Sequence, residues 1–239
     1  MKNIINKYAI KNGKLVHIDS LSRTFERGLN SRCYCPHCGD TLSARFPEGK
    51  SAYFAHSKGA CNKNDYLLSV FYYALRDAVE EKEIFYTPAL YGSYRFLPAQ
   101  TEVYRDSVEK NIKLSPIPKD KYEELAPSSW NHCGGARFFK GPDNKIAALI
   151  VNWKNYNYDF AIVMNSPELD VRKLHIPSQN IVLLNVDSLQ LTDKTTLENL
   201  KFLLRGDKVE KKWLRHYKVD KYIDKCMKQQ ISWNQKQKV

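Results

Sequence analysis

Four residues between positions 35 and 61 constrain the fold of this chain most, because Cys35, Cys38, His56 and Cys61 have the spacing of ligands to one metal ion. Two residues separate the first two cysteines, 17 separate Cys38 from His56, and 4 separate His56 from Cys61. Structural zinc sites draw thiolate and imidazole ligands from tight turns and fill all four tetrahedral positions with protein atoms. The spacing therefore predicts a structural zinc ion.

The residues around these ligands fit a small zinc module. Gly39 follows the first pair, where the chain must turn back sharply and a residue without Cβ is easiest to place. Residues 41–46 and 51–54 have the pattern of two strands joined by a turn, and a helix with apolar residues three and four apart follows from residue 65 to about 83. Knuckle, hairpin and helix in this order predict a treble-clef-like module.

The same stretch contains competing candidates for the metal site. Cys33 is expected to be a spare thiol that faces away from the site, and His37, between the two cysteines of the knuckle, is expected to face solvent or a phosphate. The alternative to a metal site is a set of unrelated buried cysteines, which pack as small apolar side chains.

Charge divides the 239 residues into three predicted parts, a basic zinc module at 1–63, a domain at 64–205 and a tail at 206–239. Of the net charge of +12, +7 falls in the module, −1 in the domain and +6 in the tail. Two basic ends of this kind favour a polyanionic partner, because lysine and arginine side chains that neutralise phosphates release the counterions bound to them. No apolar run is long enough for a membrane span or a signal segment, so we expect a cytoplasmic protein whose clustered cysteines bind metal.

Two stretches, Cys35-Pro-His-Cys-Gly39 and Tyr53-Phe-Ala-His56, followed by Cys61, resemble the zinc-finger-like region of the bacterial competence protein CoiA-like family. The resemblance covers about a quarter of the chain. It implies a following nuclease-type domain of the PD-(D/E)XK class and a role in handling DNA, in a bacterium or its mobile elements. Phosphate contacts would then come from basic residues around the zinc hairpin, which are Arg32, Arg45, Lys50, Lys58 and Lys63.

The resemblance also implies catalytic positions in the second domain. Asp143 would hold Mg²⁺, and Lys154 would orient or activate the attacking water. The class signature has an acidic residue where this chain has Asn152, and Mg²⁺ prefers carboxylate oxygen to an amide. The domain is therefore either a divergent Mg-dependent endonuclease or a degenerate core that only binds DNA or a partner.

The rest of the pattern predicts an α+β or α/β domain with a mixed sheet of the restriction-nuclease-like type. Expected strands lie at 84–89, 94–97, 102–104, 111–114, 136–139, 146–153, 158–164 and 180–186, with a helix at 193–204. His132 and Cys133, next to two glycines, are expected in a loop of no catalytic role. The chain from residue 206 reads as a basic amphipathic helix.

Two functions follow from the sequence. The first is a zinc-containing protein that binds nucleic acid, expected to be DNA, with divergent or lost nuclease activity. The second is a non-enzymatic adaptor or inhibitor, for example in phage defence or a mobile element, that docks a partner protein through the degenerate core or the C-terminal helix.

Overall fold

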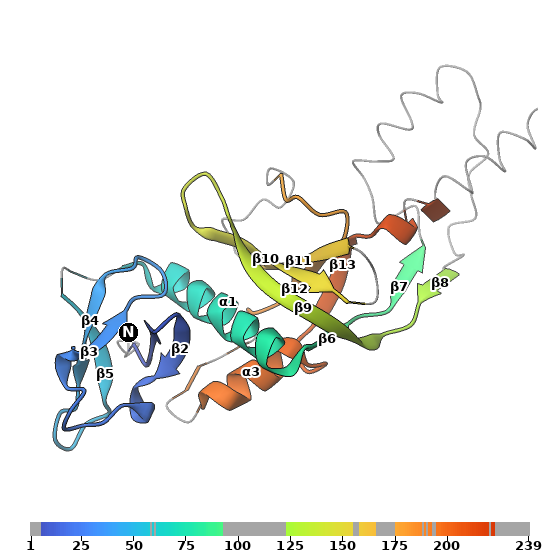
Figure 1. Ribbon diagram of the computed structural model, residues 1–239. Helices are drawn as coiled ribbons and strands as arrows, with labels where there is room; N and C mark the ends of the chain where they lie inside the picture. The colour runs from blue at the N-terminus through green and yellow to red at the C-terminus, as the bar shows by residue number, and fades with distance from the viewer. Residues whose placement is uncertain are drawn as a thin grey trace, which may run out of the picture.

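A computed structural model describes residues 6–57, 59, 61–92, 123–154, 158–165, 175–187, 189, 191–192, 195–219 and 221–222. Over these residues the chain is an α+β protein with two main sheets and a small two-stranded one. Figure 1 shows the N-terminal sheet at one end of the molecule and the six-stranded sheet on the other side of a long helix.

The N-terminal sheet has five strands in the order β2-β1-β3-β4-β5, with antiparallel neighbours throughout. A turn at Asn12 and Gly13, both with positive φ, closes the first hairpin. The strands are β1 Tyr8–Lys11, β2 Lys14–His17, β3 Gly28–Tyr34, β4 Thr41–Arg45 and β5 Tyr53–His56, with a short 3-10 helix η1 at Ile18–Ser20. The pattern of residues 28–34 was not predicted as a strand, because only Ser31 and Cys33 of its middle are buried and a bulge breaks its pairing with β4.

The long helix α1, Lys63–Lys82, begins and ends where capping chemistry places its ends. The side chain of Asn62 accepts hydrogen bonds from the backbone N–H groups of Asn64 and Asp65. Glu83 follows in the left-handed conformation, with φ of 52°. Helix α1 was predicted within two residues of these bounds, because both its cap and its apolar periodicity are visible in the sequence.

The six-stranded sheet has the order β13-β12-β11-β10-β9-β6, in which β11 and β12 are parallel and every other pair is antiparallel. Its strands are β6 Ile84–Thr87, β9 Ser129–Lys140, β10 Ile146–Trp153, β11 Tyr158–Met164, β12 Ile181–Leu184 and β13 Lys211–Arg215. Strands β7 Leu90–Gly92 and β8 Glu123–Ala126 form the small sheet, and helix α3 spans Leu197–Arg205.

One apolar core joins the two main sheets through α1. Its buried members include Phe54 of β5, Leu75 and Val79 of α1, Leu149 of β10 and Leu200 of α3. The buried residues of α1 include consecutive ones such as Val70, Phe71 and Tyr72, so more than one face of the helix is covered. The zinc module and the second domain predicted from the sequence therefore share a core.

Two buried tyrosines of α1 fix the helix to each sheet. The hydroxyl of Tyr66 donates to the carbonyl of Tyr8 in β1 (2.8 Å). The hydroxyl of Tyr72 donates to the carbonyl of Ala147 in β10 (2.9 Å) and accepts from the N–H of Met164 in β11 (3.0 Å). These bonds set the position of α1 against strands far away in the sequence.

Two predictions from the sequence are wrong. The prediction of a loop for His132 and Cys133 fails because both residues lie inside β9, where Cys133 is buried. The predicted helix from residue 206 fails at residues 211–215, which form β13 because Trp213 packs against Trp153 and the backbone pairs with β12. Residues 217–219 and 221–222 are helical, while the predicted strands at 94–97, 102–104 and 111–114 lie outside the described residues.

Candidate metal centre

The four predicted zinc ligands come together from three separate turns of the chain. Cys35 and Cys38 lie in the turn after β3, His56 is the last residue of β5, and Cys61 lies just before α1. One potential ligand atom from each residue lies within 4.8 Å of the others. The predicted ligand set is therefore confirmed as a cluster that can hold a metal ion.

Backbone hydrogen bonds shape the knuckle that carries the first two thiols. The N–H of Cys35 donates to the carbonyl of Asp40 (2.8 Å), and the N–H of Gly39 donates to the carbonyl of Cys35 (3.0 Å). Gly39 has φ of 75°, a left-handed conformation that suits a residue without Cβ. The sequence places glycine there because the chain must reverse directly after the second thiol.

The donor set fits zinc in its spacing and in its chemistry. The Sγ atoms of Cys35 and Cys61 lie 3.7 Å apart. Two sulfurs bound tetrahedrally at about 2.3 Å from one zinc would be separated by about 3.8 Å. His56 Nε2 is buried and has no hydrogen-bond partner among the described residues, so a metal ion would satisfy an atom that is otherwise unpaired.

Burial makes the thiols of this cluster poor acids on their own. It raises the pKa of Cys35 well above the ordinary value, although hydrogen bonds from the backbone of Cys38 and His37 act in the other direction. Burial also raises the pKa of Cys61. A cation is what would stabilise these groups as thiolates, which are the form that binds zinc.

His37 of the knuckle, predicted to face solvent or a phosphate, instead faces α1. Its Nε2 atom lies 3.7 Å from a carboxylate oxygen of Asp65, and its Nδ1 atom lies 3.5 Å from Ser69 Oγ. Lys145, in the turn between β9 and β10, contacts the same oxygen of Asp65 at 3.1 Å. The knuckle is thus linked through the first turn of α1 to the six-stranded sheet.

Cys33 is outside the cluster, as predicted. It is fully buried, and its Sγ atom lies 3.4 Å from the carbonyl oxygen of Ser31. Cys33 is therefore a packing residue of the N-terminal sheet.

The predicted catalytic residues do not all come together. Asp143 lies in the turn before β10, and Lys154 directly follows this strand. Strand β10 lies between Asp143 and Lys154, and its eight residues span about 26 Å. Asp143 lies 3.9 Å from Lys145, whereas Lys154 pairs with Glu83, which terminates α1.

Asn152 is near an acidic residue that the sequence did not single out. Its Nδ2 atom lies 3.3 Å from a carboxylate oxygen of Asp159, the residue opposite it in β11, and Arg137 of β9 pairs with the same carboxylate at 2.8 Å. Asn152 also packs over Gly134, where an added Cβ would lie 2.8 Å from Asn152 Oδ1. In the sequence Asp159 stands out only as an acidic residue at the start of an apolar strand. Its partners become apparent only once the register between β10 and β11 is known.

The predicted nucleic-acid contacts are exposed where the structure describes them. This holds for Arg32, Arg45, Lys50 and Lys63, and none of the four pairs with an acidic side chain of the described residues. Lys58 lies outside the described residues. These four charges are therefore not neutralised by acidic side chains of the described residues.

No protein-family model, curated protein or solved structure matches this chain. In the part of the chain that the structure describes, no helix has the length and apolar character needed to cross a membrane.

Proposed function

We propose that this chain is a nucleic-acid-binding protein whose N-terminal sheet is held together by a structural zinc ion. The observation that carries the proposal is the set of exposed basic side chains, on and next to the sheet that holds the metal cluster, that pair with no acidic side chain of the described residues. A residue that neutralises a phosphate must be free of competing carboxylates, and these side chains meet that condition among the described residues.

The metal cluster and the basic residues support each other. His56 ends the strand that pairs with β4, and Arg45 is the last residue of β4. Zinc at the cluster would fix the β4–β5 hairpin, and with it the positions of Arg45 and of Lys50 in the connecting turn. The function of zinc here is structural, since four protein ligands leave no open coordination position.

DNA is the polymer that the CoiA-like resemblance implies. The order of elements, a helix followed by the antiparallel strands β9, β10 and β11, is also the order that the resemblance implies for a nuclease-type core. Because Asp143 is far from Lys154, and because Asn152 replaces an acidic residue, we propose that binding does not depend on cleavage. Any Mg²⁺-dependent nuclease activity would need a different set of acidic residues.

The test is binding of the zinc-loaded full chain to a labelled DNA duplex at several salt concentrations. The logarithm of the association constant should fall linearly with the logarithm of salt concentration, with a slope of about −0.9 for each neutralised phosphate. The double variant Arg32→Gln/Lys50→Gln should reduce that slope by about 1.8. The matched control Lys140→Gln, which removes one exposed charge from β9, should leave it unchanged. Absence of salt-sensitive binding to both DNA and RNA would reject the proposal, and competition between the two polymers would identify the preferred one.

Cleavage needs a separate measurement, because binding does not establish catalysis. Incubation of plasmid and single-stranded DNA with Mg²⁺ or Mn²⁺ should give no cleavage that depends on Asp143 and Lys154 together. Cleavage that both Asp143→Ala and Lys154→Ala abolish, with binding retained, would show that the signature positions act as one site.

A docking role is the second candidate, and one exposed cluster favours it. Trp130 of β9 and Phe202 of α3 are 46% and 50% exposed, and the guanidinium of Arg205 lies over both rings at 5.5 and 5.8 Å. Tryptophan and arginine are enriched among residues that dominate protein interfaces. Partner binding that Trp130→Ala weakens, in a protein that shows no nucleic-acid binding, would favour this second function.

A further inference from the structure

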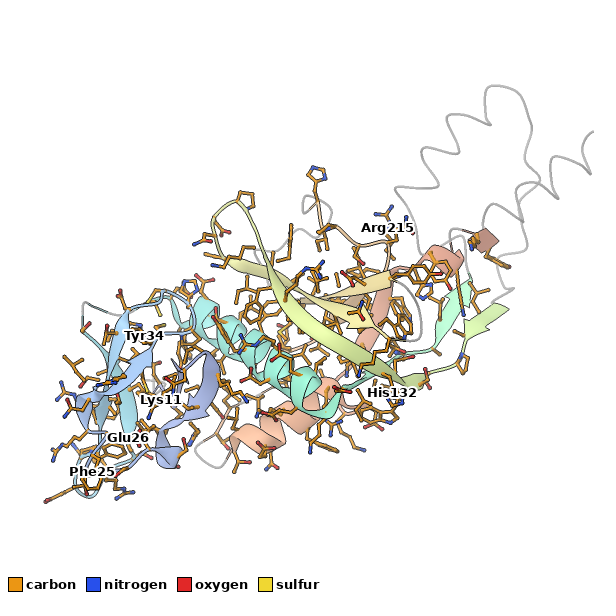
Figure 2. The ribbon with its side chains drawn as sticks, viewed as in Figure 1. Lys11, Phe25, Glu26, Tyr34, His132 and Arg215 are labelled. Carbon is orange, nitrogen blue, oxygen red and sulfur yellow. The ribbon has the colours of Figure 1, made fainter. Side chains whose placement is uncertain are left out.

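Phe25 is the most exposed large apolar side chain of the described residues, at 81% exposure. Figure 2 shows it at the outer end of the N-terminal sheet, away from α1. An aromatic ring at such a position loses the favourable burial that a partner could restore. The ring is therefore a candidate contact for a ligand.

The turn that carries Phe25 is held by hydrogen bonds. Glu26 accepts a hydrogen bond from the N–H of Ser22 (2.6 Å), and its own N–H donates to the carbonyl of Ser22 (2.9 Å). The N–H of Phe25 lies 3.3 Å from Ser22 Oγ. Glu26, labelled with Lys11 in Figure 2, also pairs with that lysine of β1, so the acidic residue of this turn is already engaged.

Three exposed arginines lie close to this turn in the fold: Arg23 within it, Arg27 directly after it and Arg45 at the end of β4. Arg23 lies over the ring of Phe46 at 6.0 Å, next to Arg45 at the end of β4. Gly28 pairs with Ala44, and Arg27 and Arg45 are the next residues of the chain on that side of the pair. No acidic side chain of the described residues pairs with Arg27 or Arg45.

We propose that this turn and the end of β4 bind single-stranded nucleic acid, with one base stacked on Phe25 and phosphates on Arg23, Arg27 and Arg45. The inference rests on the proposed function and specifies its ligand. A group of positive side chains without acidic neighbours attracts a polyanion more strongly than a protein surface of mixed charge. A single strand fits better than a duplex, because its bases are free to stack on an aromatic side chain.

The test compares binding of a labelled oligothymidylate of about 10 nucleotides with binding of a DNA duplex, using the zinc-loaded full chain. Phe25→Ala should weaken single-strand binding about tenfold or more and leave duplex binding nearly unchanged. Arg27→Gln should weaken both and should lower the salt slope for the single strand by about 0.7. Phe202→Ala is the matched control, because Phe202 is also an exposed phenylalanine but lies on α3, and it should change neither.

The outcomes separate this inference from the proposed function. If the wild-type chain binds the duplex but Phe25→Ala has no effect on the single strand, the inference is overturned and the proposed function stands. An equal loss of single-strand and duplex binding in Phe25→Ala, with zinc content and melting temperature unchanged, would overturn stacking as well. If the wild-type chain binds no nucleic acid, the proposed function and this inference both fail.

Discussion

Replacing the ligand Cys38 by serine distinguishes a metal site from a set of separately buried thiols. Cys38 is exposed, so its loss as a packing residue would change the free energy of unfolding by no more than about 0.5 kcal/mol. As one of four ligands it would carry part of a binding free energy that is about 10–16 kcal/mol for structural zinc in isolated fingers. We therefore expect Cys38→Ser to lose its zinc and to unfold the N-terminal sheet.

Cys33→Ser is the control for burial. Cys33 lies in the same sheet and is fully buried, but it is outside the ligand cluster. A buried hydroxyl at this position should cost about 1–3 kcal/mol without any loss of zinc. The contrast between an exposed residue with a large effect and a buried residue with a moderate one is the signature of coordination.

Zinc content by elemental analysis and unfolding followed by circular dichroism measure both effects. Wild-type protein should contain about one zinc per chain, and a chelator should reproduce the Cys38→Ser phenotype. Helix α1 joins both sheets in one apolar core, so loss of the metal should also lower the stability of the six-stranded sheet. Full stability of Cys38→Ser, or a folded N-terminal sheet without metal, would refute the reasoning.

Three further predictions concern the contacts around α1 and β13. Tyr72→Phe should lower the free energy of unfolding by about 1–3 kcal/mol in denaturant titrations, because it leaves the buried carbonyl of Ala147 and the N–H of Met164 unpaired; a change near zero would contradict the bridging role. Asp77→Ala should lower the free energy of unfolding by about 2–4 kcal/mol in the same assay, because the buried carboxylate accepts a hydrogen bond from the N–H of Leu15 (2.9 Å) and pairs with Arg76. An effect no larger than that of a surface substitution would contradict this role of the carboxylate. Burial lowers the pKa of His216 from the ordinary 6.5 to about 4. The contribution of the neutral imidazole to the free energy of unfolding should therefore be fully present above pH 6.5 and decline as the pH falls toward 4. The melting temperature of His216→Asn should lack this part of the pH dependence.

The elements predictable from the sequence are those whose signals are local. Helix α1 carries its own cap and periodicity, and strands β10 and β11 lie within their predicted bounds because each is a continuous apolar run. The four residues of the metal cluster were also predictable, since two short spacings identify them without knowledge of the fold.

The elements that were missed depend on contacts that are distant in the sequence. The charged segment Lys211–Arg215 becomes a strand because β12 offers it a free edge and because Trp213 packs on Trp153. The pairing of Asp159 with Asn152 depends on the register of β10 and β11, and the pairing of Lys154 with Glu83 depends on where α1 ends. Local propensity cannot supply such information, since tertiary contacts override it.

The hydrogen bonds of Tyr72 also have a consequence for the order in which the chain can fold during synthesis. Its partners Ala147 and Met164 lie 75 and 92 residues further along, so α1 leaves the ribosome long before one of its apolar faces can be covered. The N-terminal sheet is made first and can cover the other face through Tyr66 and Tyr8. In the interval the uncovered face is open to aggregation, and the large sequence separation of its contacts makes the final assembly of the second sheet the slow step. A ribosome-bound chain stalled before residue 146 should therefore expose the Tyr72 face of α1 to chaperones, and the completed chain should not.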